Sequence, residues 1–357
     1  MSGIFAAARA QSSDDHPQVA AVTGTRKARW GREENRHRER TRRHMETIHP
    51  AATIGHVHLT VSRLEEMVRF YGTVLGFHEA LRDGTRTVFL SATGGYPFHI
   101  GLTEAQDPLP PPGRAAGLYH LAVLLPSRKD LARLFRRVLR HGVRIDGAAD
   151  HSASEAIYFR DPEGNGIEIY ADRDRSRWIV RGDEIVLTSD PLDLEALLAE
   201  ATDAEAAASG AGPGARIGHV HLRVSDLDRA EAFYHGALGF QVTTRAYPGA
   251  LFFSAGGYHH HIAANIWAGR GIPRAPVGRP GLRDFTIHLP SQEEADRILQ
   301  SLAARKISIE ATVDHDTFRA ISLRDLDGIG VALTLERKVG GLSPQPSGPP
   351  LGRRGTG

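Results

Sequence analysis

Two stretches of this chain, 163 residues apart, carry nearly the same sequence. Residues 54–77 read IGHVHLTVSRLEEMVRFYGTVLGF, and residues 217–240 read IGHVHLRVSDLDRAEAFYHGALGF, with 14 of 24 positions identical. Solenoid repeats are much shorter, roughly 20 to 50 residues. The sequence therefore predicts two copies of one whole domain in tandem.

The similarity between the copies continues downstream. Residues 117–127 (GLYHLAVLLPS) match 281–291 (GLRDFTIHLPS), and residues 156–170 match 320–334, all at an offset of 164. Within each copy a strand-prone run, an amphipathic helix and shorter alternating runs follow one another twice. The predicted fold class is α+β, with four βαβββ modules in which Ser62 caps the first helix.

Composition limits the class of protein. The chain has 357 residues, of which 41% are hydrophobic and 24% charged, which is enough for two domains with cores of their own. The absence of cysteine excludes disulfides, thiolate nucleophiles and zinc–thiolate sites. No apolar run approaches 18 residues and no signal peptide is evident, so a cytoplasmic location with no membrane partner is expected.

The two ends differ in composition from the rest. Residues 1–44 hold ten Lys/Arg against five Asp/Glu, but acids are interspersed and apolar residues are few, which favours a disordered, dispensable extension over a nucleic-acid-binding arm. The expected organisation is this extension at 1–44, a first domain at 52–172, a linker with a short helix at 173–214, a second domain at 215–337 and a disordered tail at 338–357.

Three side chains of the first copy could form a metal site. His56 and His120 lie on the opening strands of its two modules, and Glu168 lies on its last strand. A lone strand histidine is more often structural, but two imidazoles and one carboxylate from paired strands are the set that holds Fe(II) and leaves positions open for other ligands. His58 shares a strand face with His56 but lies one pleat further along.

The chain resembles the vicinal oxygen chelate superfamily of glyoxalases, bleomycin-resistance proteins and extradiol dioxygenases. The motifs GHVHL, FY and LGF are common to that superfamily, whereas YHLAV and IYFRDPEGNGIEIY are closer to the two-domain catechol 2,3-dioxygenase-like branch. The resemblance covers about residues 54–335. It implies tandem domains whose four βαβββ modules form two cup-shaped half-barrels.

The resemblance also implies roles for single residues. The family's three metal ligands fall on His56, His120 and Glu168. Its tyrosine beside the substrate falls on Tyr158, ten residues before the glutamate. Histidines that handle protons are expected at His151, where the spacing is two residues short, and at His99, which is one residue out of register.

The second copy lacks part of this set. At the matching positions it has His219, Asp284 for His120, Ser322 for Tyr158 and Ala332 for Glu168. Because alanine cannot bind a metal, the first copy is expected to carry the reaction. Two interpretations of the second copy remain open, a vestigial site and an alternative metal site of His219, His261 and Asp284.

The resemblance implies an extradiol-type dioxygenase that cleaves the ring of a catechol-like substrate with Fe(II), or with Mn(II) in its place. The expected partners are a small aromatic diol and dioxygen, with no nucleic acid, and a homo-oligomer is left open. One alternative is a glyoxalase-type lyase or isomerase, which would need a fourth protein ligand. The other is a binding or resistance protein without catalysis, which would lack the full metal set.

Overall fold

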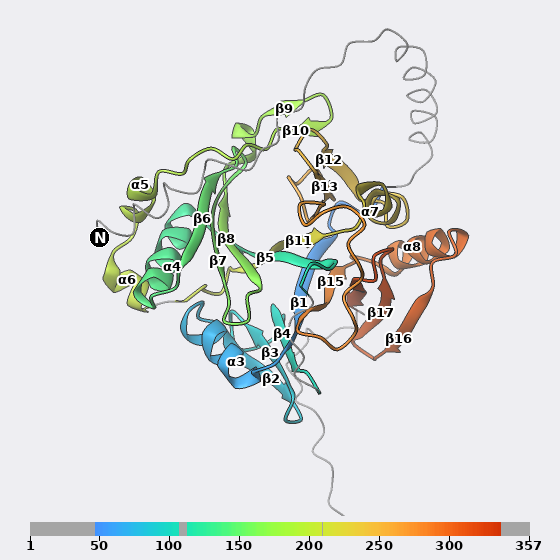
Figure 1. The fold of residues 1–357 in the computed structure, drawn as a ribbon, viewed down its shortest axis with the longest axis horizontal. Helices are drawn as coiled ribbons and strands as arrows, with labels where there is room; N and C mark the ends of the chain where they lie inside the picture. Colours follow the sequence, from blue (N-terminus) through green and yellow to red (C-terminus); the bar gives the residue numbers. More distant parts are fainter. Residues whose placement is uncertain (1–46, 107–112, 209, 337–357) are drawn as a thin grey trace, which may run out of the picture.

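The structure is a computed structural model that describes residues 47–106, 113–208 and 210–336 (Figure 1). The expectations for residues 1–44 and 338–357 lie outside this part of the chain. Each copy contains two modules in which a strand, a helix and three further strands follow one another. The predicted set of four βαβββ modules is therefore confirmed.

The first copy supplies the first two modules. They consist of β1 (Thr53–Val61), α3 (Leu64–Thr73), β2 (His78–Asp83), β3 (Thr87–Ser91) and β4 (Ile100–Glu104), and then β5 (Gly117–Leu125), α4 (Arg128–Arg140), β6 (Ile145–Asp150), β7 (Ser154–Arg160) and β8 (Gly166–Asp172).

The second copy supplies the other two. They consist of β11 (Arg216–Arg223), α7 (Leu227–Tyr234), β12 (Gln241–Thr244), β13 (Ala250–Ser254) and β14 (Ile262–Asn265), and then β15 (Gly281–His288), α8 (Gln292–Ala304), β16 (Ile309–Asp314), β17 (Phe318–Arg324) and β18 (Gly330–Glu336).

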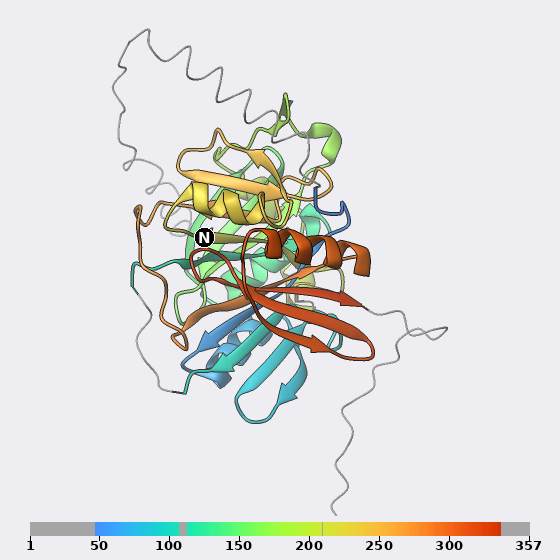
Figure 2. The same cartoon turned by 90° about the vertical axis from the view of Figure 1, so that its right-hand side faces the viewer.

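Each sheet combines one module from each copy. One sheet has the strand order β16-β17-β18-β15-β1-β4-β3-β2, and the other has the order β12-β13-β14-β11-β5-β8-β7-β6. The copies are joined by two antiparallel pairs, β1 with β15 and β11 with β5. We call the first sheet the 1/4 cup and the second the 2/3 cup, after the order of their modules along the chain. In Figures 1 and 2 the helices lie outside the strands.

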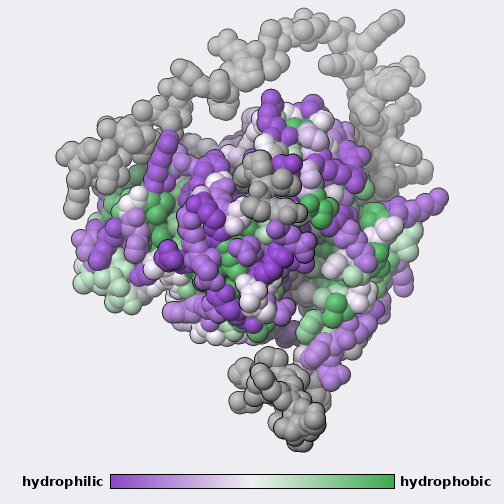
Figure 3. Space-filling model, turned by 60° about the horizontal axis from the view of Figure 1, so that its bottom comes forward, coloured by the Kyte–Doolittle hydropathy of each residue, from purple (hydrophilic) through white to green (hydrophobic). Residues whose placement is uncertain are grey.

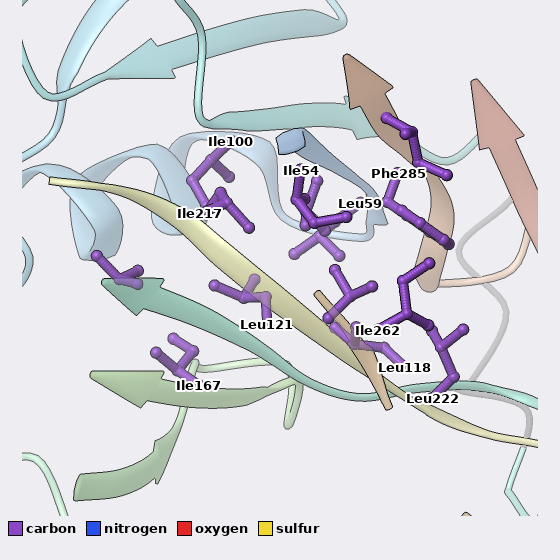
Figure 4. Close-up of a cluster of buried hydrophobic side chains, with 14 of the residues drawn as sticks. Ile54, Leu59, Ile100, Leu118, Leu121, Ile167, Ile217, Leu222, Ile262 and Phe285 are labelled. Atoms are coloured by element: carbon purple, nitrogen blue, oxygen red, sulfur yellow. The ribbon is translucent and has the colours of Figure 1, made fainter. Parts of the chain in front are cut away.

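Apolar side chains of both sheets meet in one core. Figure 4 shows residues such as Ile54 and Phe285 of the 1/4 cup beside Leu121 and Ile217 of the 2/3 cup. These side chains are almost completely buried. Burying such a side chain contributes about 1.5 to 3 kcal/mol, so this shared core holds the two sheets together.

A glycine before each first-strand histidine turns that histidine away from the core. The β11–β5 register shifts between Ile217 and His219, and the β1–β15 register shifts after Ile54. Such a bulge lets residues two apart in sequence face opposite sides, because it breaks the strand's alternation. A Cβ on Gly218 would lie 1.9 Å from the Tyr170 hydroxyl, so only glycine fits there.

The turn between the last two strands of each copy binds the copy's first helix. The Glu163 carboxylate accepts hydrogen bonds from the backbone N–H groups of Ser62 and Arg63, and the Asp327 carboxylate accepts one from Ser225 N–H. The prediction that Ser62 caps α3 is wrong. Its side chain makes no cap hydrogen bond, since the helix begins at Leu64 and Glu163 satisfies the free donors.

The same turns make a buried tyrosine–aspartate contact in each copy. The hydroxyl of Tyr71 donates to Asp161 over 3.0 Å, and that of Tyr234 donates to Asp325 over 2.9 Å. The tyrosines belong to the FY motif shared by the copies. Because each pair joins a module of one cup to a module of the other, it fixes how the two sheets lie against each other.

The segment between the copies packs against the first copy. It contains η1 (Arg175–Arg177), β9 (Val180–Arg181), β10 (Glu184–Ile185), α5 (Leu194–Leu198) and α6 (Asp203–Ala208). Arg128 and Arg136 on α4 form ion pairs with Glu200 and Asp203. On the face seen in Figure 3, polar residues surround small separate apolar areas. In the described part of the chain, no helix is long and apolar enough to span a bilayer.

Candidate active site

Three buried side chains meet in the 2/3 cup, and they come from both copies. His120 lies on β5, Glu168 on β8 and His219 on β11. The Nε2 atoms of His120 and His219 lie 3.0 and 3.1 Å from the same oxygen of Glu168. A potential ligand atom of each residue lies within 4.8 Å of the others. The three groups therefore converge on one point.

The order of strands explains this convergence. β5 lies between β8, to which it is parallel, and β11, to which it is antiparallel. The three residues lie on neighbouring strands and point to the same side of the sheet. His219 reaches that side because of the bulge at Gly218.

The electrostatics of the cluster suit a cation. Burial would raise the pKa of Glu168, but the imidazoles of His219 and His120 hold that pKa well below its usual range. Burial lowers the pKa of His219 to about 4, although Glu168 opposes this shift. At neutral pH the cluster thus offers an ionised carboxylate and a neutral His219 imidazole, the states in which these groups bind metals.

An unpaired nitrogen supports the same conclusion. His120 Nε2 is buried and has no hydrogen-bond partner among the described residues, although Glu168 is near. Leaving a buried polar atom unpaired is costly. Ligand atoms about 3 Å apart also match the spacing around an ion bound at about 2.1 Å. The donor set therefore fits a divalent metal.

A cavity of about 320 Å³ opens onto the three residues. Aromatic side chains form much of its wall, and residues of the segment between the copies complete it. The lining includes Tyr119, Tyr247, Phe252 and Trp267, together with Leu187 and Ser189. Its volume and wall suit a small, flat, apolar molecule.

Tyr158 and His151 lie in this cavity and contact each other. The Tyr158 hydroxyl lies 2.6 Å from His151 Nε2, and His151 Nδ1 contacts the carbonyl oxygen of Thr188. Since a carbonyl only accepts, Nδ1 carries the proton and Nε2 accepts from Tyr158. Burial, and then the charge of Glu168, raise the pKa of Tyr158 well above its usual value, so the phenol stays protonated.

A row of histidines lies behind His219. The ring of His260 lies 4.1 Å from that of His219, and His260 Nδ1 is 2.7 Å from His259 Nδ1. His259 Nε2 in turn lies 2.9 Å from a carboxylate oxygen of Asp172. This network packs against the His219 ring and connects the cavity to a partly exposed carboxylate. The run of three histidines at 259–261 is visible in the sequence, but its link to Asp172 could not be predicted from it.

The structure does not bring His56 or His99 to this site. His56 lies on β1 in the 1/4 cup, where it forms a separate cluster with His58 and Asp284. His99 is in that half of the molecule too, between β3 and β4, and its Nδ1 accepts a hydrogen bond from Ala92 N–H. The structure therefore does not bring His56 together with His120 and Glu168, because each cup combines modules of both copies and His219 lies beside them instead.

The alternative set of His219, His261 and Asp284 does not form either. Asp284 lies on β15 in the 1/4 cup, whereas His219 contacts Glu168 in the 2/3 cup. His261 Nδ1 is 3.1 Å from the Ser254 hydroxyl and accepts from Ala255 N–H, so it has a structural role in its turn. The members of this set are separated because the second copy is divided between both sheets.

Comparison with known proteins identifies the family. The model of the Glyoxalase/Bleomycin resistance protein/Dioxygenase superfamily matches residues 53–169 and 216–333. The chain belongs to this superfamily. It is similar to a catechol-2,3-dioxygenase of Bacillus subtilis, with 44% identity over 278 residues, which cover 77% of this chain and 95% of that protein. The resemblance stated from the sequence motifs is thereby confirmed.

Two further similarities are weaker. A manganese-dependent 2,3-dihydroxybiphenyl 1,2-dioxygenase of Geobacillus genomosp. 3 is 29% identical over 130 residues, which cover 35% of this chain and 38% of that protein. A solved Bacillus subtilis structure has a TM-score of 0.58 at 15% identity and covers 82% of this chain and 86% of that chain. The structural similarity supports the superfamily fold.

Proposed function

We propose that this protein is an extradiol-type ring-cleaving dioxygenase that acts on a catechol-like diol with a divalent metal at His120, Glu168 and His219. The convergence of these three side chains on one point, beneath a cavity with a proton-handling pair, carries the proposal. The relative named catechol-2,3-dioxygenase, similar over almost its whole length, supports it.

The donor set supports a divalent transition metal. Two imidazoles and one carboxylate are typical of non-haem Fe(II) oxygenases, and we propose Fe(II) as the resident ion. Mn(II) is compatible with the same ligands, as the name of the more distant relative illustrates. The bound ion would supply a Lewis acid that lowers the pKa of the two substrate hydroxyls and holds the diol in place.

The side chains around the ion would position the substrate and move its protons. Tyr158 presents a protonated phenol beside Glu168, to which it is paired across β7 and β8, so its oxygen can accept a hydrogen bond from a hydroxyl of the diol. His151 Nε2 lies at hydrogen-bond distance from that phenol and can accept its proton. Because Thr188 fixes the His151 ring, the pair is oriented before substrate binds.

The aromatic side chains of the cavity wall would bind the ring of the substrate. Trp267 and Tyr247 stand edge to face with neighbouring rings, at centroid distances of 5.3 Å to Tyr119 and 5.6 Å to Phe252. Such rings supply apolar area for an aromatic substrate. The wall therefore favours an aromatic diol.

The alternatives fit the site less well. A glyoxalase-type site would need a fourth protein ligand, yet among the described residues the cluster has three, and His99 lies in the other half of the molecule. A binding protein would have no use for a complete metal set with a tyrosine–histidine pair beside it. The site therefore favours the dioxygenase.

Two matched variants test the proposal. His219→Ala should lose the iron of this site and the cleavage of catechol, followed as yellow product, whereas His56→Ala should keep cleavage because it lies in the other cup. Iron is measured by elemental analysis after anaerobic purification, and folding by circular dichroism. If His219→Ala keeps iron and turnover, the assignment of the ligands is refuted.

A further inference from the structure

The 1/4 cup contains a second group of metal-binding side chains. His56 and His58 lie on β1 from the first copy, and Asp284 lies on β15 from the second. A potential ligand atom of each lies within 4.8 Å of the others. This cluster is separate from the candidate active site, and no role proposed above uses it.

The 1/4 cup has the same types of metal-binding side chain as the 2/3 cup, but partly at different positions of the repeat. By the repeat offset, His56 corresponds to His219, while Asp284 replaces His120 and Ala332 replaces Glu168. The carboxylate has thus moved from the last strand to the first strand of its module. His58, directly opposite Asp284 in the strand register, supplies the second imidazole. Two histidines and one carboxylate therefore occur in both cups.

The Asp284 carboxylate has no strong partner in the protein. No hydrogen bond to it occurs among the described residues, and the closest cation is the Arg283 guanidinium, at 3.7 Å. That guanidinium is about half exposed, and it donates a hydrogen bond over 3.3 Å to the Thr103 hydroxyl, so it stays close to the cluster. The carboxylate is only about a quarter exposed, and it has no hydrogen bond from the described residues, so it is available to a cation.

The two imidazoles are already oriented by hydroxyl groups. His58 Nε2 lies 2.8 Å from the Thr103 hydroxyl. Both ring nitrogens of His56 face the Thr286 hydroxyl, Nδ1 at 3.1 Å and Nε2 at 3.4 Å. If the nitrogen nearer the hydroxyl carries the ring proton in each case, the other nitrogen keeps the lone pair that binds a metal. Hydroxyl partners of this kind hold metal-binding histidines in a fixed orientation.

We propose that His56, His58 and Asp284 bind a second divalent cation, which joins a strand of the first copy to a strand of the second. The 1/4 cup has no counterpart of the Tyr158 hydroxyl, since Ser322 stands at the position that corresponds to Tyr158 of the 2/3 cup. Phe89 also packs edge-on against both imidazoles, with ring centroids at 5.7 and 5.3 Å, and occupies space beside them. The second ion would therefore stabilise the protein and would not cleave substrate.

The second site is more open than the first. In the 2/3 cup the two imidazoles lie 3.0 and 3.1 Å from the Glu168 carboxylate. In the 1/4 cup, no histidine nitrogen of the described residues lies within 4.0 Å of the Asp284 carboxylate. The ligands must move closer to surround an ion, and Arg283 opposes its charge. We therefore expect weaker binding here than at Glu168.

Manganese titration of the metal-stripped full chain tests this inference. Free Mn(II) is followed by its electron paramagnetic resonance signal. The wild type should bind two equivalents, Glu168→Gln should keep only the weaker one, Asp284→Asn should keep only the tighter one, and the double variant should bind none. Both substitutions keep the size of the side chain, so they are matched.

A second readout is thermal unfolding. Mn(II) should raise the unfolding temperature of Glu168→Gln, because an ion bound only by the folded state stabilises it, and should not raise that of the double variant. A wild type that binds one equivalent, lost in Glu168→Gln and kept in Asp284→Asn, would overturn the second site and leave the first intact. Loss of both equivalents in Asp284→Asn alone would also overturn it.

Discussion

Gly218 can be tested as the residue that turns His219 toward the active site. In Gly218→Ala the new Cβ would lie 1.9 Å from the Tyr170 hydroxyl oxygen and 2.9 Å from Leu124 Cβ. An ordinary van der Waals contact begins at 3.4 Å, so the hydroxyl would have to move about 1.5 Å. Leu124 cannot rotate its Cβ away, because that atom is fixed to the β5 backbone.

The expected cost follows from these contacts. Overpacking of a buried site destabilises proteins by about 1 to 3 kcal/mol. We expect the upper end of this range, about 3 kcal/mol, because the clash involves two side chains in adjacent strands. The displaced bulge should also move His219, so the variant should bind iron more weakly than the wild type.

Two comparisons separate this cause from a general loss of fold. Adding Tyr170→Phe removes the closest atom and should recover about 1 kcal/mol or more in a double-mutant cycle, although the single Tyr170→Phe change loses its 2.9 Å contact with the Tyr258 hydroxyl. Gly55→Ala in the other cup meets His288 Nε2 at 2.5 Å, the far end of a side chain that can rotate, and should cost less.

The assays are urea unfolding followed by circular dichroism and iron content by elemental analysis. A Gly218→Ala variant with wild-type stability and iron content would refute the reasoning. Equal losses in Gly218→Ala with and without Tyr170→Phe would show that the hydroxyl is not the obstacle.

Three other predictions follow from particular contacts. Tyr158→Phe should retain iron and lose about 10²-fold in turnover, because it removes one positioned hydroxyl; unchanged turnover at equal iron content would contradict the role. Tyr71→Phe and Tyr234→Phe should each lower the unfolding free energy by about 1 to 2 kcal/mol, because each leaves a buried aspartate with one donor fewer. Burial lowers the pKa of His261 to about 3, whereas the pKa of the imidazole in the unfolded chain is 6.5. Between these two pH values only the unfolded chain binds the proton, so the free energy of unfolding falls as the pH falls from 6.5 toward 3. His261→Gln should therefore reduce the slope of unfolding free energy against pH by about 1.4 kcal/mol per unit.

The sequence predicted the modules well because each one is specified locally. The alternation in GHVHL, the helical spacing up to Tyr71 and Gly76, and the repetition of both after one constant offset all depend on neighbouring residues. His120, Glu168 and Tyr158 could be found for the same reason. They lie in one module, on strands that hydrogen-bond to each other whichever partner that module takes.

The pairing of modules could not be predicted, because it depends on contacts between the copies. His56 and His219 follow the same motif, so each opening strand carries equivalent edge groups and either could lie beside β5. In the structure β11 lies beside β5, and contacts between each copy's first helix and its last turn join the two modules of that copy across the sheets. These contacts place the two modules of a copy in different sheets.

This arrangement changes what the duplication means for function. If each copy is considered by itself, Ala332 indicates that the second copy lacks a metal ligand, whereas the first copy has all three. In the structure His120 and Glu168 come from the first copy and His219 from the second, so neither copy holds a full set of ligands. Substitutions at Asp284 and Ala332 altered only the 1/4 cup, and Ser322 lies in that cup too. The residues in which the second copy differs thus lie in one cup, while its His219 belongs to the other and is as necessary to the proposed metal site as Glu168.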